Sequence, residues 1–167
     1  MTSRLLRLRT FLIVAVLVEL VAIPQAAIAE PSASLVRITR TSRWTKPSPD
    51  PMGLTYNRAA KRLMVVDSEV EETRLWARAN IWIAGSSGWA RRSWSLARFT
   101  VEPTDIAYKD RRTVFVSDDN EDRIFRVRRG PDNRWGTRDD RVRSFPTARY
   151  GSGDPEGHGR ARSGGAR

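Results

Sequence analysis

Residues 50–68 read "DPMGLTYNRAAKRLMVVDS", and residues 102–119 read "EPTDIAYKDRRTVFVSDD". Both stretches have an acidic residue and a proline, then a short apolar strand ending in tyrosine, a basic turn, and an apolar run ending in aspartate (Tyr56 and Asp67; Tyr108 and Asp118). The offset between the stretches is 52 residues, and it becomes 51 after a one-residue deletion in the turn. Self-similarity at such a period indicates a repeated supersecondary unit.

Four strand-like runs occur in each unit. They are "MGLTY", "RLMVVD", "ANIWIA" and "WSLARFTV" in the first, and "TDIAY", "TVFVSD", "RIFRVR" and "RVRSF" in the second. Val, Ile and aromatic residues favour strands, whereas the Gly, Asp and Asn between the runs favour turns. A helical interpretation of "TRLWARANIWIA" competes, because Leu75, Ala79 and Trp82 could share one face, but the tryptophans and the following "GSSG" favour a strand. Four antiparallel strands in about 50 residues are typical of a β-propeller blade.

The repeat predicts an all-β chain of two antiparallel four-stranded blades and the start of a third, which together form an incomplete ring. We expect blades at residues 50–101 and 102–153, after a linker at residues 30–49. A third copy opens on schedule with "DPEG" at residue 154, but residues 158–167 read "HGRARSGGAR" and contain no apolar residue beyond alanine. Residues 154–167 are therefore expected to be a blade start with a disordered tail, in a truncated or frame-shifted piece of a longer repeat protein.

Residues 1–29 are expected to be a signal peptide. Arg4, Arg7 and Arg9 precede the apolar run "FLIVAVLV", and Ala27-Ile28-Ala29 forms the small-x-small pattern that signal peptidase accepts. An uncleaved membrane anchor is the alternative, but the apolar run of residues 11–23 is short for a span, which needs about 20 residues. We expect a secreted or periplasmic protein with no stable membrane span after cleavage.

Composition narrows the possible chemistry. The net charge of +11 falls to +6 when residues 1–29 and 158–167 are removed, because 24 basic and 18 acidic residues then remain. The arginines are scattered, so specific nucleic-acid binding is not expected, although an Arg-rich module for an anionic surface or polymer stays open. There is no cysteine, and the single histidine is His158. No nucleophilic triad is therefore assembled, which favours a non-catalytic chain.

The stretches "EPTDIAYKDRRTVFVSDDNEDRIFRV", "GPDNRWGTRDD" and "DPEG" resemble secreted bacterial six-bladed β-propellers of the NHL, phytase-like and gluconolactonase/regucalcin-like group, over residues 50–157. The resemblance implies an exported propeller segment that binds Ca²⁺, or a protein or small-molecule partner, through acidic loops. The alternative that it implies is a fragment of a metal-dependent phytase-like or lactonase-like hydrolase. Two blades alone would leave sheet faces unpaired, so self-association is also expected.

Blade topology sorts the charged loops onto two faces. The face where the inner strand of each blade begins is expected to hold 13 of the 18 acidic residues of the core, and we name it the acidic face. Carboxylates in such number suit Ca²⁺, which takes 6–8 oxygen ligands. In the resembling propellers this mouth holds a divalent ion, which by likeness makes Asp105, Asp118 and Glu156 candidate metal ligands. A solvated surface with turn-capping aspartates is the alternative.

The stretch "GPDNRWGTRDD" at residues 130–140 would join the third and fourth strands, on the face opposite to the acidic face. It occupies the position of "GSSGWARR" in the first unit, so it must first be a hairpin connection. Its form resembles the calcium loops that read "GPDGxxGTxDD" in related secreted proteins. The resemblance implies metal ligands at Asp132, Asn133, Asp139 and Asp140. Asn133 stands where glycine is usual, and asparagine tolerates a left-handed backbone better than most residues.

Overall fold

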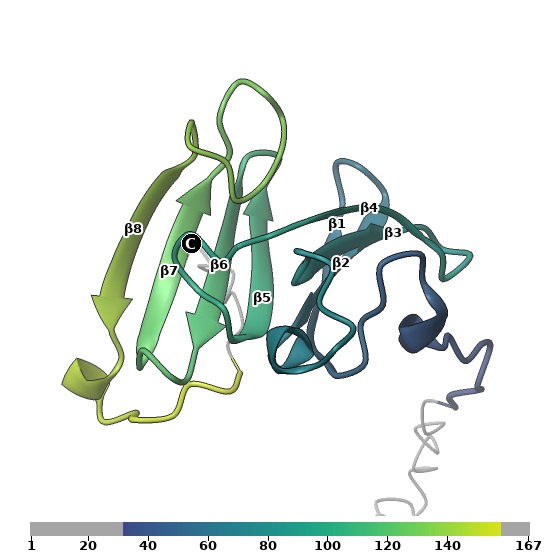
Figure 1. The fold of residues 1–167 in the computed structure, drawn as a ribbon, viewed down its shortest axis with the longest axis horizontal. Helices are drawn as coiled ribbons and strands as arrows, with labels where there is room; N and C mark the ends of the chain where they lie inside the picture. Colours follow the sequence, from purple (N-terminus) through teal and green to yellow (C-terminus); the bar gives the residue numbers. More distant parts are fainter. Residues whose placement is uncertain (1–31, 158–167) are drawn as a thin grey trace, which may run out of the picture. The chain divides into compact units, whose positions relative to one another are not determined.

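The computed structural model describes residues 32–157, and the expected signal peptide and the tail from His158 lie outside them. Eight strands form two four-stranded antiparallel sheets, shown in Figure 1. The first sheet contains β1 (Pro51–Asn57), β2 (Arg62–Asp67), β3 (Ile81–Ala84) and β4 (Ala90–Trp94). The second contains β5 (Pro103–Asp110), β6 (Thr113–Asp118), β7 (Arg123–Arg128) and β8 (Arg141–Pro146).

Each strand pairs with the next strand along the chain, so both sheets are simple meanders. The remaining elements within residues 32–157 are three short 3₁₀ turns: η1 (Thr41–Arg43), η2 (Val70–Glu72) and η3 (Ala148–Tyr150). The all-β prediction is confirmed, and the helical interpretation of residues 73–84 is wrong, because Ile81–Ala84 is a strand. No helix among residues 32–157 has the length and apolar character to cross a membrane.

The main core consists of apolar side chains from both sheets. On β6, Val114 and Val116 are buried, and on β2 the same holds for Met64 and Val66. This alternation places one face of each sheet in the shared core. The full cluster also includes Ile81, Leu96, Ile106, Phe125, Val127 and Trp135. Because both sheets contribute, neither would bury its apolar face without the other.

The inner strands β1 and β5 approach closely. The backbone N–H of Tyr108 donates a hydrogen bond to Thr55 Oγ1 at 3.1 Å. A Cβ atom on Gly53 would lie 2.5 Å from the Cα atom of Asp105, which is closer than real Cβ atoms approach. Glycine is therefore required at position 53 by the close approach of β5.

The fourth strand of the first sheet lies earlier than the sequence pattern predicts. We expected "WSLARFTV" at residues 94–101, but β4 ends at Trp94. The side chain of Asn80 draws the following residues into a turn: its Oδ1 accepts the Leu96 N–H at 2.6 Å, and its Nδ2 donates to Thr100 O at 3.2 Å. This turn places Leu96 in the core, fully buried. The connection between β3 and β4 is consequently short, and Gly88 N–H closes it onto Gly85 O at 2.9 Å.

Part of the expected linker packs on the first sheet. Trp44 is buried, and its ring lies 6.1 Å from that of Trp82 at a tilt of 44°. Each indole N–H has a backbone acceptor: Trp44 Nε1 donates to Gly88 O at 3.0 Å, and Trp82 Nε1 donates to Lys46 O at 2.9 Å. These contacts form a second apolar cluster with Val65, Val70, Ala79 and Ala84. The segment before β1 is thus part of the folded unit.

The third acid-proline pair also contacts the second sheet. Pro155 is buried, and its carbonyl oxygen accepts a hydrogen bond from Thr104 Oγ1 at 3.0 Å. The prolines at positions 51, 103 and 155 follow each other at intervals of 52 residues, and the first two open β1 and β5. Pro155 therefore contacts β5, and it follows Pro103 at the sequence interval that separates Pro103 from Pro51.

Candidate functional site

The loop between β7 and β8 is built around a buried carboxylate. Asp140 Oδ1 accepts the Gly130 N–H at 2.8 Å, and Asp140 Oδ2 accepts the Gly136 N–H at 2.7 Å. One side chain thus joins both ends of the loop. Both hydrogen bonds go to a charged acceptor, which makes them stronger than neutral ones.

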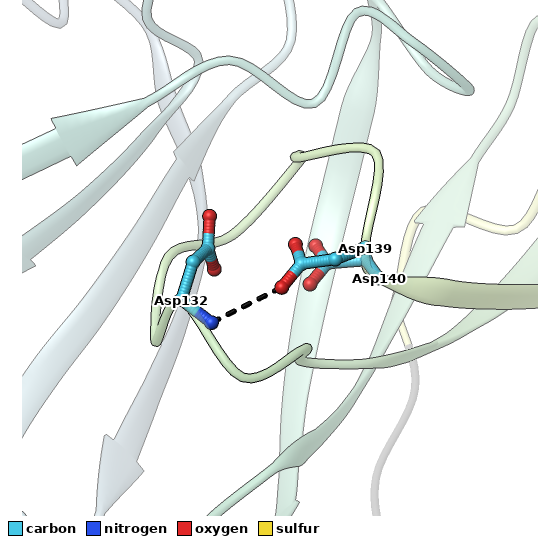
Figure 2. Close-up of side chains that lie close together, drawn as sticks. All are labelled: Asp132, Asp139 and Asp140. Atoms are coloured by element: carbon cyan, nitrogen blue, oxygen red, sulfur yellow. Dashed lines mark hydrogen bonds between the residues drawn. The ribbon is translucent and has the colours of Figure 1, made fainter.

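Two further aspartates hold the loop tip, and Figure 2 shows them beside Asp140. Asp139 Oδ2 accepts the Asp132 N–H at 3.1 Å, and Asp139 Oδ1 accepts the hydroxyl of Thr137. Asp132 Oδ1 accepts the Arg134 N–H at 2.8 Å, which closes a local turn. All three carboxylates therefore accept loop hydrogen bonds, and a carboxylate with about four lone-pair sites keeps further acceptor capacity.

The three carboxylates lie close enough to share an ion. One oxygen from each of Asp132, Asp139 and Asp140 lies within 4.8 Å of the other two, and this is the one such group among residues 32–157. Asn133, the fourth expected ligand, donates from Nδ2 to Pro131 O at 3.2 Å, and its Oδ1 is the atom that would bind an ion. Its φ of 59° is left-handed, as expected where related loops have glycine.

The loop is anchored to the core by its own tryptophan. Trp135 is only 2% exposed and belongs to the main apolar cluster, and the guanidinium of Arg129 lies 5.3 Å from its ring centroid. Gly136 has a φ of +76°, and a Cβ atom there would lie 1.8 Å from Ser95 O. Glycine is therefore required at this turn. The aspartates are consequently positioned by packed and hydrogen-bonded neighbours.

The surroundings shift the pKa values of two of these carboxyls in opposite directions. Burial raises the pKa of the Asp140 carboxyl, although the Gly130 and Gly136 N–H groups act against that rise. The Thr137 hydroxyl and the Asp132 N–H hold the pKa of Asp139 below its ordinary value. A cation between these groups would stabilise the charged form of Asp140, since opposite charge lowers the pKa of a carboxyl.

The acidic face is the other candidate, and its two buried aspartates have structural partners. Asp118 Oδ1 accepts the Glu121 N–H at 2.7 Å, and Asp67 Oδ2 accepts both the Ser48 hydroxyl at 2.6 Å and the Asp50 N–H at 2.9 Å. Burial raises the pKa of Asp67 and also that of Asp118. Both aspartates therefore cap the chain at the ends of β2 and β6.

Acids from both sheets gather at the acidic face. Burial raises the pKa of Glu71, and the nearby charge of Glu102 adds to the rise. Burial likewise raises the pKa of Glu102, with a further rise from the charges of Asp119 and Asp118. Buried carboxylate oxygens without a hydrogen-bond partner occur here on Glu71, Asp119 and Asp122.

The structure does not gather the three residues expected at the mouth into one ligand set. Asp105 lies within β5 and is half-buried, Asp118 ends β6, and Glu156 is exposed beyond Pro155. Within residues 32–157 they do not form a group of three carboxylates at ligand spacing. The loop of Asp132, Asp139 and Asp140 is therefore the better-defined candidate metal site.

Sequence reasoning missed a basic feature on the second sheet. Four arginines of β7 and β8 line one hollow: Arg126, Arg128, Arg141 and Arg143. The alternation of arginine with apolar residues in "RIFRVR" and "RVRSF" was the available signal. The chain as a whole matches no protein-family model and no curated protein.

Proposed function

We propose that this chain is a two-blade β-propeller segment that binds Ca²⁺ through its acidic loops and is non-catalytic as it stands. The blade interpretation is supported by two consecutive four-stranded meanders that share one core. It is also supported by the prolines at positions 51, 103 and 155, which keep the repeat interval of 52 residues. Four-stranded meanders that repeat around an axis are the building units of propellers.

The observation that carries the calcium proposal is the carboxylate group of Asp132, Asp139 and Asp140, whose oxygens lie within 4.8 Å of one another. Hard oxygen ligands favour Ca²⁺ over zinc, which prefers nitrogen and sulfur. The hydrogen bonds of the loop already hold the three side chains together, so little further ordering would be needed on binding. Ca²⁺ would also offset the repulsion among three neighbouring negative charges.

Calorimetric titration of the chelator-treated protein with CaCl₂ tests this proposal. We expect one site with a Kd of about 0.1–1 mM, the range of extracellular calcium modules. Asp132→Asn should weaken binding by about tenfold, because it removes one charged ligand while its Oδ1 can still accept the Arg134 N–H.

Asp110→Asn is the matched control. Asp110 Oδ1 accepts the Arg112 N–H at 2.9 Å, so it closes the same kind of turn as Asp132 but lies outside the carboxylate group. This variant should bind Ca²⁺ like the wild type. Absence of heat with the wild type, or equal weakening in both variants, would remove the loop as the calcium site.

Family likeness suggested a cation at Asp105, Asp118 and Glu156 on the acidic face, but the structure does not gather these three residues. The acids that influence one another there are Glu102, Asp118 and Asp119. Burial raises the pKa of Glu102, and the charges of Asp119 and Asp118 add to the rise, so a cation there would relieve repulsion between like charges. Asp119→Asn should leave Ca²⁺ binding unchanged if the β7–β8 loop alone holds the ion. A loss of a second binding event in this variant would assign an additional ion to the acidic face.

The partner in this proposal is a second copy of the chain. Every second residue on one face of β1 is apolar and exposed: Met52 is 48% exposed, Leu54 61% and Tyr56 50%. Exposed apolar rows of this kind favour association. Light scattering after size-exclusion chromatography should give more than the monomer mass for the wild type, and Leu54→Ser should shift the protein toward monomer. A monomeric wild type at high concentration would argue against self-association.

A further inference from the structure

The outer strands of the second sheet carry two pairs of arginines that face each other. Arg126 on β7 lies opposite Arg143 on β8, and Arg128 lies opposite Arg141. Between them, the pair of Val127 and Val142 packs toward the core. The arginines therefore share the other face of the sheet, and they alone line a hollow of about 240 Å³.

This arrangement is electrostatically costly without an anion. Like charges directly opposite each other destabilise a strand pair. Arginine cannot relieve the repulsion by losing a proton, because its guanidinium stays charged in proteins. On the neighbouring strand, the residues opposite Arg126 and Arg128 are Phe115 and Thr113, and neither carries a charge. Strand β6 thus places no opposite charge directly beside the two arginine pairs of β7 and β8.

One of these guanidinium groups also has an unused donor. Arg126 Nε is buried and has no hydrogen-bond partner. A buried donor without an acceptor costs free energy that a bound acceptor would recover. The guanidinium fork matches the oxygen geometry of phosphate groups, which accept two parallel N–H bonds.

A second basic hollow lies at the β7–β8 loop. It has a volume of about 400 Å³ and is lined by Arg111, Arg112 and Arg129 with Gly130, Pro131 and Asn133. Arg129 Nε is another buried donor without a partner. Arg128 and Arg129 are consecutive, but Arg129 lies over the buried Trp135 ring whereas Arg128 faces away from the core, so the second hollow is separate from the first. The two arginine pairs of the first hollow by themselves favour a ligand with more than one anionic group.

We propose that the arginines of β7 and β8 form a binding site for a linear polyphosphate-type anion. Successive arginine pairs are two residues apart, which corresponds to about 6.6 Å along a strand. A chain of linked phosphate groups can place one charged group at each pair and accept the free donor of Arg126. The proposal is independent of calcium binding, since none of the four arginines belongs to the carboxylate group.

The test uses sodium tripolyphosphate, titrated by calorimetry into the chelator-treated protein in calcium-free buffer at 50 mM NaCl. The wild type should bind tripolyphosphate about tenfold more tightly than inorganic phosphate, because more than one pair of arginines is engaged. The double variant Arg141→Gln/Arg143→Gln should lose about tenfold or more in affinity. Circular dichroism should show that it folds, since both side chains are exposed in the wild type.

Arg91→Gln/Arg92→Gln is the matched control. These exposed arginines lie on β4, the outer strand of the first sheet, and their removal lowers the net charge by the same amount. The control should change tripolyphosphate affinity by less than about twofold. Equal losses in both double variants would show binding by net charge alone and would overturn the proposed site. No binding by the wild type at 50 mM NaCl would overturn it as well.

Discussion

Gly53 on β1 lies so close to Asp105 on β5 that a Cβ atom at position 53 would be 2.5 Å from the Asp105 Cα atom and 2.6 Å from Val66 Cγ2. The backbone of one sheet thus contacts the other at this point, and no flexible side chain can move aside to make room. Close packing of the two inner strands depends on this glycine.

Gly53→Ala should therefore destabilise the chain by about 1–3 kcal/mol, the usual cost of overpacking a core. Urea unfolding followed by circular dichroism measures the change. Gly153→Ala is the matched control, because a Cβ atom there meets nothing within 4 Å. Equal stability of the two variants would contradict the tight contact of β1 with β5.

Trp44 stabilises the first sheet although it lies before the first strand of that sheet. Trp44→Ala should lower the free energy of unfolding by about 3–5 kcal/mol, because it removes a buried aromatic side chain and leaves a cavity over Trp82. Trp89→Ala serves for comparison, since the Trp89 side chain is 63% exposed. If the two substitutions had similar small effects in chemical denaturation, residues 41–48 would be a dispensable linker.

Asp118 should make stability depend on pH. Burial raises the pKa of its carboxyl in the folded chain above the ordinary 3.8. The folded state then binds the proton more tightly than the unfolded state, so this contribution to stability is complete below the ordinary pKa and is lost as the pH rises through the folded-state pKa.

Asp118→Asn removes the titrating group and keeps an oxygen acceptor for the Glu121 N–H. Relative to the wild type, this variant should become progressively more stable as the pH rises from the ordinary carboxyl pKa through the raised pKa of Asp118. Urea midpoints at several pH values give the comparison, with Glu121→Gln as an exposed control in the same turn. A stability difference that stayed constant with pH would show that Asp118 is not desolvated in the fold.

The stability of the β7–β8 loop should depend on the two acceptor oxygens of Asp140 rather than on the shape of its side chain. Asp140→Asn is nearly isosteric, but it places an NH₂ group opposite the N–H of either Gly130 or Gly136. We expect a loss of about 1–3 kcal/mol in calcium-free buffer, the cost of a buried donor left without an acceptor. Asp132→Asn should cost less than about 0.5 kcal/mol, because Asp132 is exposed and uses one oxygen. An Asp140→Asn variant as stable as the wild type would refute the anchoring role of this carboxylate.

The strand content could be predicted from the sequence because each strand has its own local alternation of apolar and polar residues, as in "TVFVSD" and "RIFRVR". The prediction failed for residues 95–101, whose turn is held by Asn80, a residue sixteen positions before Leu96. The packing of Trp44 on Trp82 was missed for the same reason, because the two residues are far apart in the sequence and no local pattern joins them.

The candidate sites also differ in how far the local sequence could predict them. The carboxylates of Asp132, Asp139 and Asp140 belong to one hairpin connection, so their proximity follows from the motif. The mouth residues Asp105, Asp118 and Glu156 come from separate segments, and the structure gives them separate positions. The arginine pairs depend on the register of β7 with β8, which the spacing of single strands does not fix.

A ¹H–¹⁵N NMR titration with CaCl₂ tests the proposed calcium site most directly, because it locates the ion along the chain. The Gly130 and Gly136 amides both donate to Asp140, so their resonances report on that carboxylate. The proposal predicts saturable shifts concentrated in residues 130–140, with the amides of residues 67–72 and 118–122 unchanged. An absence of shifts, or shifts confined to those acidic-face residues, would contradict it.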